Sequence, residues 1–246
     1  MLRHGRKKGN RRKVSIVQQS EQATVSQREG ASAAPLQIAV LVSGKGRGTN
    51  LGALLAACAS GQIPGRIAVV IGTRADAPAM ERAREAGVDA VVLSPRKYED
   101  DEAGYADALL RALQRRNVGL ICLAGYMRKL PLPVIEAYRG RIMNVHAALL
   151  PLFGGQGMYG EHVHRAVLES GMKVSGCTVH FVDEQYDTGP IIVQTAVPVL
   201  EEDTPETLAA RVLPEEHRAY VRAVQLFAQG RLRLEGRRVR VLPPAS

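Results

Sequence analysis

The strongest constraint on the fold is a regular alternation of short apolar runs with longer amphipathic segments over residues 37–126. The apolar runs are rich in Val, Ile, Leu and Ala, which is typical of parallel strands covered on both faces. They stand at 38–43, 66–73, 89–95 and 118–126. One intervening segment has an expected N-cap at Asp76, Pro78 in the first turn and a C-terminal stop at Gly87. The alternation predicts a doubly wound α/β domain with helices on both faces of the sheet.

The alternation of apolar runs and amphipathic segments changes after residue 142, and the pattern there predicts a mixed sheet. The strand-like run "IMNVHA" is followed by a glycine-rich loop and a helix at about 160–170. Two more strand-like runs, "CTVHFVDE" and "IIVQTAVPV", are joined by the turn "QYDTG" and can pair antiparallel. A final helical region extends from Thr204 to Gly230, with an interruption expected at Pro214, and a terminal hairpin follows. We therefore expect one domain over residues 37–246.

The positive net charge of +9 belongs mostly to the first 36 residues. That segment holds eight Lys and Arg against two Asp and Glu, whereas residues 37–246 hold 25 against 22. It has no aromatic residue for base stacking and no apolar periodicity, so we expect residues 1–36 to be a disordered basic extension. Nucleic-acid binding through this extension is the alternative function outside enzymes.

Composition also indicates the cellular compartment in which the protein is expected. No apolar run approaches the ~20 residues that span a bilayer, and no apolar signal segment opens the chain. The three cysteines, Cys58, Cys122 and Cys177, lack CxxC spacing and are typical of reduced thiols rather than of disulfides or a zinc site. We expect a cytoplasmic protein that does not contact membranes and that is a monomer or a homodimer.

The loop "SGKGRGTN", residues 43–50, follows the first predicted strand and opens a helix. Free N–H groups at a helix N-terminus attract phosphate. A dinucleotide fingerprint would need Gly where Thr49 stands, and the sequence has no Gly-Lys-Ser/Thr phosphate loop. Two interpretations of this loop stay open on its own residues: a site for a monophosphate ligand, or a glycine-rich turn that only allows tight packing.

Three polar residues stand near the ends of apolar strands, where ligands bind in open α/β sheets. Asn144 and His146 lie two apart on one strand and share a face, and Asp187 lies in the turn beside a neighbouring strand. Each alone is a common structural residue, but together they suit one chemistry. A carboxylate raises the pKa of a nearby imidazole and orients it, so the imidazole can protonate a developing oxyanion while the amide donates a hydrogen bond.

The surrounding residues argue against two other chemistries. No Ser or Cys nucleophile stands beside His146, which favours direct attack by a substrate nucleophile without a covalent enzyme intermediate. His162 and His164 lie two apart on an expected helix, so their side chains diverge by about 200° around it. We therefore expect no metal site there.

Five motifs together resemble the phosphoribosylglycinamide formyltransferase branch of the folate-dependent formyltransferase family over residues 37–230. They are "VLVSGKGRGTNL", "CLAGYMRKL", "MNVHAALLP", "GCTVHFVDEQYDTGPII" and "PEEHRAY". The resemblance implies a Rossmann-like formyltransferase fold, with a mostly parallel mixed sheet and helices on both faces. It also implies formyl transfer from 10-formyltetrahydrofolate to the amine of phosphoribosylglycinamide, in de novo purine biosynthesis, with small-molecule substrates and no metal.

The resemblance implies a role for each matching residue. Gly48, Thr49 and Asn50 match the segment that holds the substrate phosphate, and Glu216 matches a carboxylate on the amine and ribose side of that substrate. Asn144, His146 and Asp187 match the catalytic trio. The positions that match the folate-binding segments are Met127, Arg128, Lys129, Leu130, Asp183, Glu184, Gln185 and Tyr186.

The chain departs from the family pattern in several places. The loop at 43–50 is two residues longer than the usual "SGxGSN". Ala147 and Ala148 replace a Pro and a Ser directly after His146, which removes a fixed φ and a hydroxyl. Pro214 precedes Glu216 and is expected to break the helix there.

Two related enzymes with the same catalytic core are alternatives. A formyltetrahydrofolate deformylase is expected to carry an N-terminal regulatory domain, for which residues 1–36 are too short and too polar. A methionyl-tRNA formyltransferase is expected to carry a C-terminal barrel, but only 16 residues follow Gly230. Neither enzyme needs a loop for a ribonucleotide phosphate, which the loop at 43–50 resembles.

Overall fold

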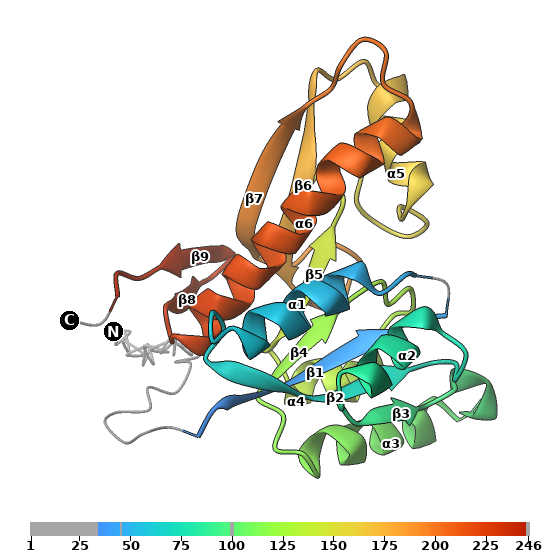
Figure 1. The fold of residues 1–246 in the computed structure, drawn as a ribbon, viewed down its shortest axis with the longest axis vertical. Helices are drawn as coiled ribbons and strands as arrows, with labels where there is room; N and C mark the ends of the chain where they lie inside the picture. The colour runs from blue at the N-terminus through green and yellow to red at the C-terminus, as the bar shows by residue number, and fades with distance from the viewer. Residues whose placement is uncertain (1–33, 45, 99–100, 245–246) are drawn as a thin grey trace, which may run out of the picture.

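A computed structural model describes residues 34–44, 46–98 and 101–244, so the expectation for residues 1–36 falls almost wholly outside it. Within these residues one seven-stranded sheet and a separate hairpin are formed (Figure 1). The strands are β1 Leu36–Val42, β2 Gly65–Gly72, β3 Ala90–Val92, β4 Leu120–Leu123, β5 Ile142–His146, β6 Val174–Phe181, β7 Ile191–Pro198, β8 Leu232–Glu235 and β9 Arg238–Val241. The α-helices are α1 Thr49–Ala59, α2 Pro78–Glu85, α3 Glu102–Gln114, α4 Leu132–Ala137, α5 Glu161–Glu169 and α6 Pro205–Ala228, and Pro95–Tyr98 forms a 3₁₀ turn.

The sheet is mixed and mostly parallel, as predicted. Its strand order is β3-β2-β1-β4-β5-β6-β7. The pairs from β3 to β5 are parallel, whereas β6 runs antiparallel to both β5 and β7. The chain moves outward from β1 to β3 and then returns to the other side of β1 with β4. In open α/β sheets the ligand crevice lies where strand order reverses in this way, and the reversal here is at the carboxyl ends of β1 and β4.

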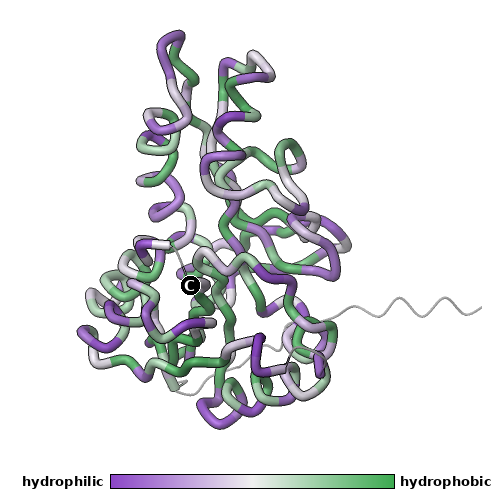
Figure 2. Tube along the Cα trace, turned by 90° about the vertical axis from the view of Figure 1, so that its right-hand side faces the viewer, coloured by the Kyte–Doolittle hydropathy of each residue, from purple (hydrophilic) through white to green (hydrophobic). Residues whose placement is uncertain are grey.

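Helices cover both faces of the sheet and create two apolar cores. One core joins α1, α2 and α6 to the sheet through side chains such as Leu54, Met80 and Tyr220. The other joins α3 and α4 to the opposite face, and it contains Leu109 and Leu113 of α3. Figure 2 shows the hydrophobic segments running through the interior of the molecule. The predicted α/β layering is therefore confirmed.

The predicted N-cap of α2 is wrong. Ala77 occupies the cap position, and Pro78 stands at the first helical position. The Asp76 carboxylate instead accepts a hydrogen bond from Arg74 Nε at 2.9 Å. Asp76 lies one residue too early to cap the helix, and the adjacent guanidinium takes its carboxylate.

The predicted interruption of the last helix at Pro214 is also wrong, because α6 continues unbroken from Pro205 to Ala228. Thr204 caps it through a reciprocal pair of hydrogen bonds with Thr207. Buried apolar side chains lie on both sides of the proline, including Val212 before it and Tyr220 after it. Their burial against the sheet stabilises the helix despite the hydrogen bond that the proline cannot make.

Replacing Pro214 by Ala is expected to stabilise the protein. The substitution restores a backbone N–H inside an intact helix, and we expect the free energy of unfolding to rise by about 1–2 kcal/mol. Pro205→Ala is the matched control, since proline is favourable at the first helical position and its loss should bring no gain. Urea unfolding measures both, and a lower stability of Pro214→Ala would contradict this account.

Candidate active site

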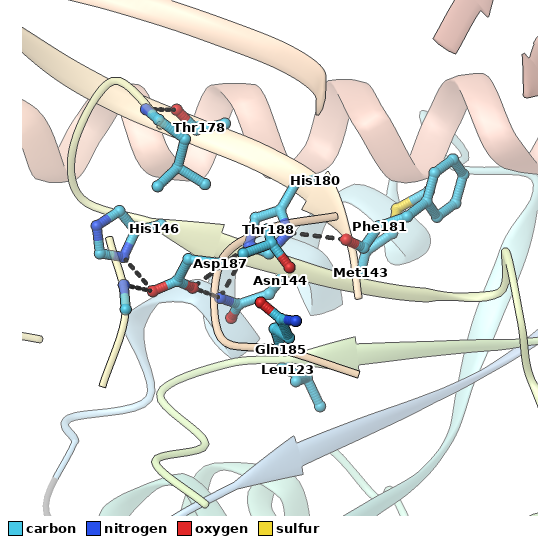
Figure 3. A network of polar contacts seen from close by, with 12 residues as sticks. Leu123, Met143, Asn144, His146, Thr178, His180, Phe181, Gln185, Asp187 and Thr188 are labelled. Carbon is cyan, nitrogen blue, oxygen red and sulfur yellow. Dashed lines mark hydrogen bonds and ion pairs between the residues drawn. The ribbon is translucent and has the colours of Figure 1, made fainter. Parts of the chain in front are cut away.

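The predicted trio gathers at the carboxyl end of β5. Asn144 and His146 project from one face of this strand, and Asp187 reaches them from the loop between β6 and β7 (Figure 3). Asp187 Oδ2 lies 3.6 Å from His146 Nδ1, and Asn144 Nδ2 lies 3.4 Å from Asp187 Oδ1. His146 is buried and Asn144 is half-buried. The structure thus brings together the three residues that the sequence singled out.

A fourth polar residue, His180 on β6, completes the group and was missed from the sequence. Its Nε2 lies 3.3 Å from Asn144 Nδ2 and 3.6 Å from Asp187 Oδ1. His180 is placed there because it pairs directly opposite Asn144 in the antiparallel register of β5 and β6. A polar residue in the apolar run "CTVHFV" was the available signal, but that register was needed to place it beside Asn144.

Hydrogen bonds to backbone carbonyls fix a proton on each imidazole. His146 Nε2 lies 2.7 Å from the Phe153 carbonyl oxygen, which can only accept, so Nε2 carries the hydrogen. In the same way, His180 Nδ1–H donates to the Phe181 carbonyl at 2.8 Å. The other nitrogen of a neutral His180 then accepts a hydrogen bond from the Asn144 amide. Asn144 is therefore oriented with its NH₂ group toward His180 and Asp187.

The expectation of a raised pKa for His146 is wrong, although Asp187 does act in the upward direction. Burial lowers the pKa of His146, and this outweighs the attraction of Asp187 and the hydrogen bond to Phe153. Burial would raise the pKa of Asp187, but contacts with His180, His146 and the Gly155 N–H hold it below its ordinary value. At neutral pH the resting site therefore holds a neutral His146 beside an ionised Asp187.

The Asp187 turn is itself tightly constrained. Asp187 has φ of 56°, an uncommon value for a residue with a side chain. Its Oδ2 accepts a hydrogen bond from Gly155 N–H at 3.0 Å, which links it to the loop after β5. Asp183 Oδ1 closes the same turn by accepting hydrogen bonds from Gln185 N–H and from Thr188 Oγ1. These contacts hold the carboxylate of Asp187 against His146.

The two segments predicted to bind folate lie at the same end of the sheet. Residues 127–130 follow β4, where Met127 is exposed and Leu130 is buried. Ser43, at the end of β1, accepts a hydrogen bond from Met127 N–H and donates one to the Gly125 carbonyl. In the second segment, 183–186, Glu184 forms an ion pair with Arg139 and Tyr186 is exposed. Each segment therefore combines an anchored backbone with exposed side chains.

The predicted phosphate loop opens α1 beside the end of β1. Gly48 takes the cap position with φ of 68°, and a Cβ there would lie 2.9 Å from the Ala79 backbone. Both the conformation and the close approach require glycine. Arg47 is exposed, and Lys45 lies outside the described residues. Close packing is therefore sufficient to explain the glycine at position 48. The first N–H groups of α1 lie at the same end of the sheet as the end of β1.

Glu216 of α6 lies beside this loop. Asn50 Nδ2 donates a hydrogen bond to Glu216 Oε2 at 3.0 Å. Burial raises the pKa of Glu216, and the Asn50 hydrogen bond opposes this only in part. Asn50 Oδ1 is buried with no hydrogen-bond partner among the described residues. One acceptor oxygen of the pair, Asn50 Oδ1, is therefore left without a donor from the described part of the chain.

Within the described ranges, no group of three or more His, Cys, Asp and Glu residues is placed to hold a metal ion. On α5, His162 is exposed whereas His164 is buried, so the two imidazoles lie on different sides of the helix. None of the helices that the structure describes is long and apolar enough to cross a membrane.

Comparison with known proteins identifies the family of this chain. The sequence profile described as formyl transferase matches residues 36–224. The chain belongs to the formyl transferase family. The match covers the whole seven-stranded sheet and most of α6, and it begins at the first residue of β1.

Named relatives are similar in sequence to this formyl transferase over most of its length. The chain is 37% identical to the Escherichia coli phosphoribosylglycinamide formyltransferase, over 81% of this chain and 90% of that protein. It is 39% identical to the chloroplastic phosphoribosylglycinamide formyltransferase of Arabidopsis thaliana, over 85% of this chain and 72% of that protein. The crystal structure of glycinamide ribonucleotide transformylase 1 from Symbiobacterium toebii has 51% identity and a TM-score of 0.81, and the match covers 89% of this chain and all of that one.

Stability is expected to fall as the pH drops below about 6.5. Burial lowers the pKa of His146, His164 and His217, so the unfolded chain takes up protons at these residues before the folded chain does. The ionised Asp187 extends this loss below about pH 3.9. Urea unfolding at pH 7.5, 6.5 and 5.5 measures the dependence.

The variant His164→Gln isolates one of these contributions. His164 is buried and its Nδ1 has no hydrogen-bond partner within the described part, so its replacement should weaken the pH dependence. His162→Gln, at an exposed position on the same helix, is the matched control. Equal slopes for wild type and His164→Gln would contradict this assignment.

Proposed function

We propose that this formyl transferase moves the formyl group of 10-formyltetrahydrofolate to the amine of 5'-phosphoribosylglycinamide, a step of de novo purine biosynthesis. The observation that carries the proposal is the arrangement around the sheet crevice. The trio Asn144, His146 and Asp187 lies on β5 and the β6–β7 loop, and the Asn50–Glu216 pair lies beside the loop after β1. Relatives named phosphoribosylglycinamide formyltransferase or glycinamide ribonucleotide transformylase match most of the chain.

Substrate binding follows from the chemistry at the two ends of the crevice. The N–H groups at the start of α1, around Gly48, Thr49 and Asn50, attract the dianionic phosphate. Glu216 and Asn50 Oδ1 accept hydrogen bonds from the hydroxyl or amine groups of the ribonucleotide. The folate lies against the segments 127–130 and 183–187, which places its formyl group toward β5.

The reaction begins when the substrate amine attacks the formyl carbon. Negative charge then develops on the formyl oxygen, and donors placed in advance stabilise it. His146 Nε2–H donates to the Phe153 carbonyl in the resting site, and the formyl oxygen takes the place of that carbonyl. An anionic oxygen is a stronger acceptor than a peptide carbonyl, so this exchange is favourable. Asn144 provides the second hydrogen bond when one of its N–H groups exchanges its resting contact with His180 or Asp187 for the formyl oxygen.

Proton transfer completes the reaction. The attacking amine loses one proton, and the folate nitrogen that held the formyl group gains one as its C–N bond breaks. Asp187 stabilises positive charge on the imidazole of His146 during this transfer, because its carboxylate lies 3.6 Å from Nδ1. The neutral resting state of His146 allows it to accept a proton as well as to donate one.

The alternatives are less well supported. The deformylase from Pseudomonas syringae shares 22% identity with this chain, so that likeness concerns the fold alone. A role in binding nucleic acid would depend on residues 1–36, which lie almost entirely outside the described residues. A cytoplasmic location and a monomeric or homodimeric state stay predictions, and the Arabidopsis relative is named as chloroplastic.

The direct test mixes purified protein with phosphoribosylglycinamide and 10-formyltetrahydrofolate and follows the formation of tetrahydrofolate. We expect turnover that requires both substrates. Turnover that proceeds equally without the ribonucleotide would identify a deformylase and would refute the proposal.

The roles of the trio are tested by His146→Ala and Asp187→Ala. Each is expected to lower kcat by about 10²–10⁴-fold while the protein stays folded, because each removes a group that acts on the reacting atoms or on their charge. His162→Ala is the control, since His162 is exposed on α5. Near-wild-type kcat in either trio variant would refute the assigned role.

A further inference from the structure

A buried side-chain network lies directly behind His146 and has no part in the mechanism described so far. It is built on a row across three strands, in which His146 pairs with Thr178 and Thr178 pairs with Gln194. Paired residues point to the same face of a sheet. Figure 3 shows Thr178 on the strand next to His146. The row therefore places the Thr178 hydroxyl and the Gln194 amide beside the backbone that follows His146.

The Thr178 hydroxyl has every hydrogen-bonding position filled. It donates to the Ala148 carbonyl at 2.6 Å and accepts from Leu150 N–H at 3.0 Å. Gln194 Nε2 donates to the same hydroxyl at 3.1 Å and to the Leu150 carbonyl at 2.9 Å. Thr178 is fully buried, and Ala148 and Leu150 are buried as well. A buried hydroxyl with three partners is well fixed and holds those partners in place.

These hydrogen bonds hold a segment that lies beyond the last paired residues of β5 and β6. The ladder between β5 and β6 ends at the pair of His146 and Thr178, and residues 147–150 then leave the sheet. Ala147 and Ala148 provide neither a fixed φ nor a side-chain hydrogen bond of their own. The segment nevertheless returns to the site, because the Phe153 carbonyl accepts the Nε2–H hydrogen bond of His146.

We propose that Thr178 and Gln194 form a clamp that positions His146 by fixing the segment between His146 and Phe153. They are positioning residues, since they act through the backbone and touch neither substrate. The inference rests on the proposed function for its kinetic consequence. Its structural consequence, the protection of Leu150 N–H, does not depend on turnover.

Thr178→Val keeps the shape of the side chain and removes the hydroxyl. We expect kcat to fall by about 10–100-fold, because a small displacement of a catalytic group has effects of this size. KM should change by less than about threefold, because ground-state binding is not touched. Thr178→Ser restores the hydroxyl and is expected to restore kcat to within about threefold of wild type.

Ser175→Ala is the matched control for losing a buried hydroxyl from β6. Ser175 is buried, and its Oγ has no hydrogen-bond partner in the described part of the chain. We therefore expect wild-type kcat from this variant. Gln194→Met tests the clamp from its other side and should lower kcat in the same direction. The double variant Thr178→Val/Gln194→Met should be little worse than Thr178→Val alone, since the two residues act as one unit.

Hydrogen exchange gives the readout that is independent of turnover. The Leu150 amide should exchange at least about tenfold faster in Thr178→Val than in wild type, and at the wild-type rate in Thr178→Ser. Wild-type kcat in Thr178→Val, a change in KM alone, or failure of Thr178→Ser to restore kcat would overturn the proposal. If Thr178→Val does not fold, wild-type kcat in Gln194→Met would overturn it. Absence of formyl transfer in the wild type would refute the proposed function, while unchanged Leu150 exchange in Thr178→Val would refute the clamp.

Discussion

The Asp187 carboxylate is the contact on which the site depends. One of its oxygens faces Asn144 and His180, and the other faces His146 and the Gly155 N–H. These partners come from β5, from β6 and from the loop after β5, so a single buried charge joins three parts of the chain. A buried carboxylate is stable only when such partners are present. In the proposed reaction the same charge is available, without rearrangement, when positive charge develops on His146.

Burial and charge act in opposite directions on His146, and burial prevails. The sequence shows that a carboxylate and an imidazole are both present, but it does not show how much water reaches them. The predicted rise in the pKa of His146 therefore failed, although the partners themselves were correctly identified. A neutral imidazole that lies beside an ionised carboxylate suits a reaction in which one proton must be taken up and another released.

Most of the fold could be predicted from residue patterns, because the buried parallel strands are continuous apolar runs that alternate with amphipathic segments. What could not be predicted depends on long-range packing. Pro214 signals a break when it is considered locally, yet buried residues on both sides keep α6 intact. His180 becomes part of the site only through its register with Asn144, and Thr178 only through its register with His146. A single sequence does not show which residues of neighbouring strands are paired.

The resting site is built around a neutral His146 that carries its hydrogen on Nε2. Nitrogen-15 NMR of the imidazole in the full chain, followed across pH, measures both features directly. We expect a pKa below the ordinary value of about 6.5 and, at higher pH, a neutral ring protonated at Nε2. A pKa above about 6.5, or a neutral ring protonated at Nδ1, would refute this description of the site.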